Sequence, residues 1–230
     1  MKKPNLGIVA VLLLLTASML GAILLLYNSK NIKQVEETAI PVVVAYNKSQ
    51  RSYSSAVHIG DGYFLTAAHI LSNNQKEIVL ETSLNQVFIA ELVWSNTAYD
   101  ISLFYAKDYD LVDIEQFNID CSALSFGDQL RFIGNPVGLK FVTTWGAVSS
   151  YESISVENLW EKVLVVNASI VPGMSGGAAV DINNRLRGIN VGTLRSIAGM
   201  SPFGTLPSFA GLSYIVESSD ICLLMDENKQ

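Results

Sequence analysis

Cysteine and histidine are both scarce in this sequence, with two of each among 230 residues. They show no spacing typical of a metal site, and no glycine-rich loop of the phosphate-binding kind occurs. A basic cluster is also missing: 21 acidic residues outnumber 15 Lys and Arg, and the formal net charge is −6. An acidic surface repels a phosphate backbone. The composition therefore predicts no metal, no cofactor and no nucleic-acid partner.

Charge is absent from one long apolar stretch, Leu6–Tyr27, which has no charged residue in 22 positions. As a helix it would be roughly 33 Å long, enough to cross a hydrocarbon layer of about 30 Å. A cleaved signal peptide has a shorter apolar region and then a small-residue cleavage site, which the following "LLLYNSK" lacks. The stretch therefore predicts a transmembrane signal anchor over residues 6–27, after a short flank of residues 1–5. A cleaved signal peptide is the alternative.

The segment after the apolar stretch, residues 28–38, is polar and without periodicity, as expected of a linker. Residues 1–38 contain four Lys and two Glu, which leaves a net charge of −8 for Ala39–Gln230. Because lysines flank the apolar stretch on both sides, the charge rule favours a cytoplasmic N-terminus only slightly. That orientation would place Ala39–Gln230 outside the cytoplasm.

Short apolar runs separated by turn residues fill the rest of the chain. The runs are "IPVVVAY", "SSAVHIG", "YFLTAAHI", "EIVLET", "QVFIAELVWS", "DISLFYA", "QLRFIGN", "VTTWGAVSS", "KVLVVNAS", "GAAVDI", "LRGINVGT" and "AGLSYIV". Many short strands with close turns are typical of all-β sandwiches and barrels. The length suits one large domain or two fused small ones, with Ile114–Leu124 as the crossing point. One helix is expected over Val216–Glu227, where Ile221, Leu224 and Met225 recur at helical spacing.

A cluster of glycine and proline surrounds one serine, Ser175, in "VNASIVPGMSGGAAVDINN". A tight hairpin would explain an isolated Gly-Ser-Gly cluster, since glycine is retained where the backbone needs positive φ or a close approach. The alternative is that Ser175 is a nucleophile whose neighbours leave backbone N–H groups free for an oxyanion. "GMSGG" also fits the G-x-S-x-G elbow of α/β-hydrolases, which place their histidine after the serine. Both histidines, His58 and His69, precede Ser175, so that fold is excluded.

An order of His, Asp and Ser is available to activate the serine. His69 ends "YFLTAAH", and Asp100 opens the strand "DISLFYA", from which its carboxylate could point inward. Either residue alone would usually be structural. His58 is the alternative base, although its alternation with Val57 and Ile59 favours a place on a sheet face. The alternative acids lie in a polar connecting region: Asp108, Asp110, Asp113 and Asp120.

"LTAAH", "DISLF" and "GMSGG", in that order, resemble the trypsin/chymotrypsin superfamily of serine proteases. "DGYFLTAAHI", "FIGNPVGLKFVTTWGAVSS", "VNASIVPGMSGGAAVDINNRLRGINVGT" and "AGLSYIV" are most similar to its HtrA-type bacterial branch and extend the resemblance over most of residues 50–225. The resemblance implies an all-β fold of two six-stranded chymotrypsin-like β-barrels, about 39–115 and 122–216, with a C-terminal helix at about 216–227. The whole of residues 39–230 would then be one protease domain.

The resemblance also implies residue roles. Ser175 would be the nucleophile, His69 the general base and acid, and Asp100 the carboxylate that orients the imidazole. The backbone N–H groups of Gly173 and Ser175 would form the oxyanion hole. Residues of the substrate pocket would include Ser169, Asn190, Thr193 and Leu194. Since trypsins carry an aspartate where Ser169 stands, we expect cleavage after small or medium apolar residues instead of after Arg or Lys.

Two departures from the resembled family are visible. HtrA-type proteins generally carry a C-terminal PDZ domain, and we expect none here because the chain ends soon after the predicted helix. Trypsin-like zymogens use an aspartate just before the nucleophile, where this chain has Met174, so activation by a new N-terminus is not expected. Arg195–Phe209 is longer than a hairpin needs and is either a mobile activation loop or a surface insertion. "GMSPFGTLP" within it should break the strand pattern.

The expected function is that of a membrane-anchored serine endopeptidase, with polypeptide substrates and a lipid bilayer as partners. A proteolytically inactive, membrane-tethered binding module with the same fold is the alternative. The two cysteines, Cys121 and Cys222, are either buried thiols or a disulfide. The resemblance implies the disulfide, because the C-terminal helix of that superfamily packs near the connection between the barrels.

Overall fold

The computed structural model describes residues 40–47, 52–71, 75–109, 113–156, 159–201 and 204–228. All of them belong to one of the two units into which the chain divides, Thr38–Gln230. The apolar stretch and the linker, for which we predicted an anchor and a spacer, lie outside the described residues. Among the residues that are described, no helix is both long enough and apolar enough to cross a membrane.

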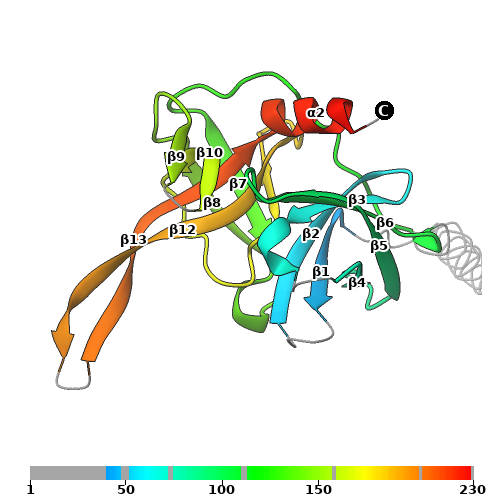
Figure 1. The fold of residues 1–230 in the computed structure, drawn as a ribbon, viewed down its shortest axis with the longest axis horizontal. Coiled ribbons are helices and arrows are strands. Elements are labelled where there is room, and N and C mark those ends of the chain that lie inside the picture. Colours follow the sequence, from blue (N-terminus) through cyan, green and yellow to red (C-terminus); the bar gives the residue numbers. More distant parts are fainter. Residues whose placement is uncertain are drawn as a thin grey trace, which may run out of the picture. The chain divides into compact units, whose positions relative to one another are not determined.

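The first half of the domain is a closed barrel of six antiparallel strands in the order β1-β2-β3-β6-β5-β4, with β4 paired back to β1 (Figure 1). A closed barrel leaves no strand edge unpaired. The strands are β1 (Val42–Asn47), β2 (Ser52–Gly60), β3 (Tyr63–Ala67), β4 (Glu77–Glu81), β5 (Val87–Asn96) and β6 (Ile101–Tyr105).

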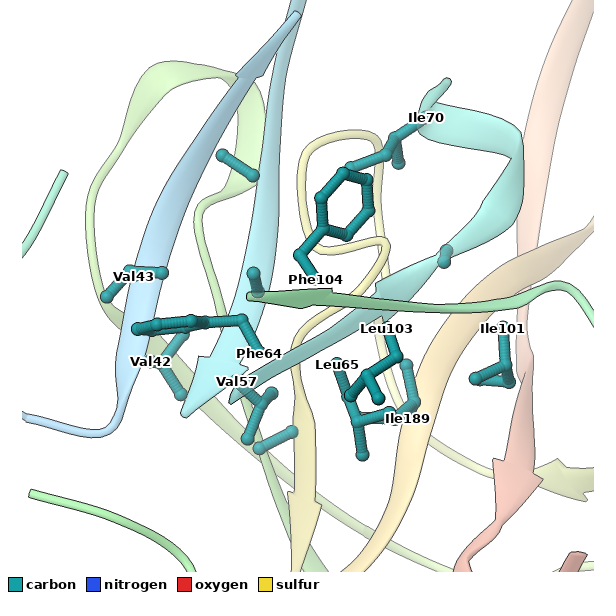
Figure 2. Close-up of a cluster of buried hydrophobic side chains, with 14 of the residues drawn as sticks. Val42, Val43, Val57, Phe64, Leu65, Ile70, Ile101, Leu103, Phe104 and Ile189 are labelled. Carbon is teal, nitrogen blue, oxygen red and sulfur yellow. The ribbon is translucent and has the colours of Figure 1, made fainter. Parts of the chain in front are cut away.

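The barrel encloses its apolar side chains and shares them with the rest of the domain. In β5, buried or half-buried residues alternate with exposed ones, which is the pattern of a strand with one face on the core. Figure 2 shows Phe64, Leu65 and Phe104 among the buried side chains of this cluster, with Ile189 of β12 beside Leu65. One continuous core therefore joins the barrel to the strands of the second half.

The second half is a seven-stranded antiparallel sheet in the order β8-β7-β11-β12-β13-β10-β9. Its strands are β7 (Gln129–Gly134), β8 (Val142–Ala147), β9 (Ile154–Val156), β10 (Trp160–Val166), β11 (Ala178–Val180), β12 (Leu186–Ser201) and β13 (Gly204–Glu217). The predicted all-β class and the first six-stranded barrel are confirmed. A second closed six-stranded barrel is not, because these strands form a sheet of seven with β8 and β9 at its two ends.

The strand break that we expected at "GMSPFGTLP" falls inside that segment, since β12 ends at Ser201 and β13 begins at Gly204, but both strands extend further into it than expected. They pair with each other from Gly188↔Glu217 to Ser201↔Gly204, and their far ends run out as a two-stranded arm (Figure 1). The register of the arm is irregular between Thr193 and Arg195 and between Ile197 and Met200, on either side of the pair Ile197↔Pro207. Bulges are where a strand tolerates proline. Arg195–Phe209 is therefore part of a paired hairpin.

An α-helix, α2 (Ser218–Glu227), follows β13 and confirms the predicted C-terminal helix within two residues. Ile221 and Leu224 of α2 are buried in the common core. A disulfide joins Cys222 of this helix to Cys121, with 5.9 Å between their Cα atoms, so the disulfide hypothesis is confirmed. Cys121 lies in the segment between β6 and β7, which contains the predicted crossing point.

Candidate functional site

His69 lies on a short 3-10 helix, η1 (Ala68–Ile70), that follows β3 directly. The two alanines of "TAAH" are buried, and the amide of Ala68 donates a hydrogen bond to the backbone carbonyl of Asp100 at 3.0 Å. The small side chains let the Asp100 segment approach this closely. The imidazole itself is accessible, with 46% of the His69 side chain exposed.

The Asp100 carboxylate is only 2% exposed and accepts three hydrogen bonds. Its Oδ1 accepts from the His69 backbone N–H at 2.7 Å, and its Oδ2 lies 2.6 Å from His69 Nδ1. The indole Nε1–H of Trp160 donates to the same Oδ2 at 3.0 Å. Asp100 has a positive φ of 58°, a conformation that aspartate tolerates better than most residues. Three donors compensate the cost of burying this charge.

Ser175 occupies a tight turn between β10 and β11. The turn is closed by hydrogen bonds from Met174 N to Val171 O at 3.0 Å and from Gly177 N to Met174 O at 2.9 Å. Gly176 has a φ of +80°, and a Cβ there would lie 2.1 Å from Ser55 O, so only glycine fits. Glycine follows the serine because the turn packs directly against the barrel strand β2.

Two backbone N–H groups of this turn, those of Gly173 and Ser175, have no acceptor among the described residues. The carbonyl of Pro172 accepts a hydrogen bond from Val137 N at 2.9 Å. In the trans peptide bond between Pro172 and Gly173, the N–H points away from that carbonyl. The Gly173 amide therefore points away from the Val137 loop, and its φ of +99° is accessible chiefly to glycine.

Ser55 of β2 is a buried residue that hydrogen-bonds to the serine turn, and it was not identified from the sequence. Its hydroxyl donates to Gly173 O at 2.9 Å and accepts from Asn135 N and Asn135 Nδ2, both at 3.0 Å. Its backbone N–H donates to Ser175 O at 2.9 Å. The barrel thus holds the backbone of the serine turn at two points. A buried serine in an apolar strand gives no local signal of this role, because its partners lie far away in the sequence.

His69, Asp100 and Ser175 all line one cavity of about 930 Å³. The cavity also includes Pro172 and Gly173 of the serine turn. Its apolar wall comes mainly from the second half of the domain, with Ala68, Ile70 and Leu71 added from the barrel half. The residues from the second half include Val156, Leu159, Trp160, Ile170, Val171, Val191, Leu194 and Tyr214. A mostly apolar cavity with a few convergent polar groups is the usual form of a ligand site.

The structure separates the alternatives for base and acid. His58 is 4% exposed on β2, with Nδ1 2.9 Å from Glu115 O and its ring stacked on Phe64 at 4.9 Å. It does not line the cavity, and burial lowers its pKa, although the Glu115 carbonyl and Asp61 act in the opposite direction. His58 is therefore a core residue, as its alternation indicated. Of the alternative acids, Asp108, Asp113 and Asp120 do not line the cavity either, and Asp110 lies outside the described residues.

Two of the four predicted pocket residues line the cavity, Thr193 and Leu194. The other two do not. Ser169 is exposed and does not line the cavity, whereas the next residue, Ile170, is buried and does. Asn190 is fully buried within the sheet, where its backbone pairs with Gly177.

The fold and the site define a class of protein: an all-β, chymotrypsin-like domain whose His–Asp pair lines the same cavity as a serine on a glycine-rich turn. Residues 54–189 match the family of trypsin-like peptidase domains. The chain belongs to that family.

Curated relatives and solved structures agree with this assignment. The periplasmic pH-dependent serine endoprotease DegQ of Escherichia coli is 33% identical over 156 residues, which cover 66% of this chain and 33% of DegQ. The periplasmic serine endoprotease DegP of the same organism is 34% identical over 151 residues, covering 64% of this chain and 31% of DegP. This chain thus spans about a third of the length of the curated relatives it matches.

Among solved structures, a serine endoprotease from Yersinia pestis superposes with a TM-score of 0.62 at 26% identity. The matched region covers 84% of this chain and 64% of that one. The inactive form of the Rv3671c protease superposes with a TM-score of 0.65 at 14% identity, over 83% of this chain and 89% of that one. At that identity the second match shows the fold alone.

Proposed function

We propose that this protein is a serine endopeptidase of the HtrA type that hydrolyses peptide bonds through an acyl-enzyme. The observation that carries the proposal is the accessible imidazole of His69, held on a buried carboxylate at 2.6 Å, in the same cavity as Ser175. Family membership supports it, and the relatives DegQ and DegP carry the name of serine endoprotease.

In the proposed reaction, the Ser175 hydroxyl attacks the carbonyl carbon of the scissile bond. His69 takes the hydroxyl proton on Nε2 and later gives it to the leaving amine. In deacylation, His69 takes a proton from water, which attacks the acyl carbon, and then returns the proton to the oxygen of Ser175. Asp100 holds Nδ1 protonated, which leaves Nε2 free to act as the base. The described residues include no hydrogen bond between Ser175 Oγ and His69. Contacts of this kind are often long before substrate binds.

The free N–H groups of Gly173 and Ser175 would stabilise the oxyanion of the tetrahedral intermediate. A preorganised donor of this kind contributes roughly 3–4 kcal/mol to the transition state. The Pro172–Gly173 peptide supports this role, because its carbonyl is already bonded to Val137 N and its N–H points to the other side.

For substrate preference we propose small or medium apolar residues on the acyl side of the scissile bond. Ile170, Val191 and Leu194 supply an apolar wall next to the serine turn. A charged side chain would have to leave water for this wall without a partner, which is costly. A peptide-library cleavage profile of the full chain would test this, and a preference for Arg or Lys would contradict it.

The cellular arrangement is also a proposal: residues 6–27 anchor the chain in a membrane, residues 28–38 form the linker, and residues 39–230 face the extracytoplasmic side. The charge-free stretch supports the anchor. The periplasmic relatives support the orientation. Protease protection of intact cells or spheroplasts would check it, since an outward domain is digested without lysis.

A fluorophosphonate probe tests the proposed chemistry directly, because it labels only an activated serine. We expect the full-length chain to be labelled at Ser175 and to hydrolyse casein. Ser175→Ala and His69→Ala should each abolish both signals, and the double variant should be no worse than either single variant, since such residues act as a unit. If the wild-type protein is folded and remains unlabelled, the inactive binding module is the better interpretation.

A further inference from the structure

Trp160 connects the substrate cavity to the buried carboxylate of Asp100. The residue opens β10, and its indole ring lines the cavity. The same indole donates its Nε1–H to Asp100 Oδ2 at 3.0 Å. The next residue, Glu161, donates its backbone N–H to Ala98 O at 2.8 Å, so the start of β10 is fastened to the segment that carries Asp100.

The space occupied by the Trp160 ring depends on a glycine in the opposite wall. A Cβ at Gly192 of β12 would lie 2.5 Å from Trp160 Cη2 and 3.3 Å from Cζ2. On another side the indole packs against Tyr214 of β13, with 5.5 Å between ring centroids. The ring is thus confined by two strands of the sheet while its N–H reaches a residue at the end of the barrel.

The donors on the two carboxylate oxygens are not equivalent. Oδ1 is held by a backbone N–H, that of His69, which η1 fixes. Oδ2 faces His69 Nδ1, the hydrogen bond that sets the imidazole tautomer, and its other donor is Trp160 Nε1. Without the indole N–H, Oδ2 would depend on the imidazole alone for its position.

We propose that Trp160 is a positioning residue of the active site: its indole N–H fixes Asp100 Oδ2 and through it the orientation of His69, and Gly192 keeps the space that the ring needs. The proposal rests on the proposed protease function for its kinetic consequence. Its structural consequence, a change in the His69–Asp100 hydrogen bond, does not depend on turnover.

The direct test is Trp160→Phe in the full-length protein, which removes the N–H donor and keeps an aromatic ring in the wall. Because a hydrogen bond to a charged group contributes more free energy than a neutral one, its loss should lower kcat by about 10- to 100-fold. Trp145→Phe is the matched control, because Trp145 on β8 is 68% exposed and does not line the cavity. It should keep the wild-type kcat.

A second measurement separates positioning from simple packing. In the absence of substrate, the low-field proton resonance of His69 Nδ1–H reports on its hydrogen bond to Asp100. We expect this resonance to shift or broaden in Trp160→Phe and to remain unchanged in Trp145→Phe. A variant with altered KM but wild-type kcat and an unchanged resonance would show that Trp160 is only part of the cavity wall, and would overturn the proposal.

Gly192→Ala provides an independent variant in case Trp160→Phe does not fold. The added methyl group displaces the indole, so the His69 resonance should shift here as well. Phenylalanine lacks the Cη2 atom that the new Cβ would meet, so Gly192→Ala should cost less kcat in the Trp160→Phe background than in the wild type. An unchanged resonance in Gly192→Ala, or equal costs in both backgrounds, would refute the role of Gly192. If wild-type protein shows the resonance but no fluorophosphonate labelling, the protease function fails while the positioning role of Trp160 stands.

Discussion

The closed barrel and the seven-stranded sheet contribute different kinds of groups to the same cavity. From the barrel come two side chains, His69 and Asp100, which lie close in space at the ends of β3 and β6. From the sheet come Ser175, two free backbone N–H groups and most of the apolar wall. The barrel thus provides a hydrogen-bonded pair of side chains, whereas the sheet provides the serine on a shaped backbone turn.

The two regions also differ in how their contribution is held in place. The barrel pair is fixed largely by its own hydrogen bonds, with one additional donor from the sheet, Trp160. The serine turn depends on the other region, because Ser55 of the barrel bonds to Gly173 O and Ser175 O. Activity should therefore be sensitive to charge in the barrel pair and to backbone support in the turn.

The largest effect is expected from Asp100→Asn, which removes the charge of the barrel pair. An amide at this position favours the wrong imidazole tautomer, and a loss of about 10⁴ in kcat is expected with the fold preserved. Steady-state kinetics with a peptide substrate, combined with a thermal unfolding curve, would measure both. Full activity in a folded Asp100→Asn protein would show that another group orients His69.

The next largest effect concerns the junction of the two regions. Cys121 lies in the connection between them and Cys222 lies on the helix that follows the sheet, 101 residues later. Replacing both by serine should lower the free energy of unfolding by about 2–5 kcal/mol, because a long covalent loop no longer restricts the unfolded chain. Denaturant titration with and without reductant would measure it. Reductant should destabilise the wild type and leave the stability of the double variant unchanged. Equal stability of the two proteins under oxidising conditions would contradict the prediction.

A smaller effect on catalysis is expected from Ser55→Ala, which removes the support of the serine turn. The buried Asn135 and the carbonyl of the half-buried Gly173 each lose a partner, and an unsatisfied buried group typically costs about 1–3 kcal/mol. We expect kcat to fall by about 10- to 100-fold, and Ser55→Thr, which keeps the hydroxyl, to recover part of the loss.

The matched control for Ser55 is Ser218→Ala. Ser218 is another fully buried serine whose hydroxyl donates to a backbone carbonyl, that of Asp120, but it does not line the cavity. This control should lose stability and keep its kcat. If Ser55→Ala behaves in the same way as Ser218→Ala, the turn is rigid without the barrel hydroxyl.

The smallest effect is a pH dependence of stability from the core of the barrel. Burial lowers the pKa of His58 below its ordinary value of 6.5, and the folded protein therefore favours the neutral ring. The unfolded chain binds the proton more readily, so this contribution to stability is present at neutral pH and is lost as pH falls below about 6.5. His58→Gln, which does not titrate, should show a smaller loss of unfolding free energy between about pH 7.5 and about pH 5.5 than the wild type. Equal losses would show that His58 is accessible to protons in the folded state.

Local sequence patterns were sufficient to make His69 and Asp100 candidates for the barrel half of the site. The small residues of "TAAH" and the position of Asp100 at the start of a strand indicated them, while His58 and other aspartates stayed open as alternatives. The family resemblance then paired these two residues, which the structure brings within 2.6 Å although they are 31 residues apart.

The sheet half depends on contacts that no local pattern encodes. Ser55 and Gly173 are 118 residues apart, and Asp100 and Trp160 are 60 residues apart. Ser169, which we expected in the substrate pocket, is exposed and does not line the cavity, whereas its neighbour Ile170 does. The strand break expected at "GMSPFGTLP" lies within that segment, between Ser201 and Gly204. Both strands nevertheless extend into the segment because they pair with each other up to Ser201↔Gly204, a pairing that glycine and proline content alone does not reveal.

The disulfide has a consequence for how this chain responds to cutting. Every peptide bond between Cys121 and Cys222, including those of the serine turn and the hairpin arm, lies inside one covalent loop. A single nick anywhere in that loop leaves the two fragments joined. The nicked protein therefore migrates as one species on a non-reducing gel and separates into two only after reduction. Damage or self-cleavage within the loop goes undetected on such a gel.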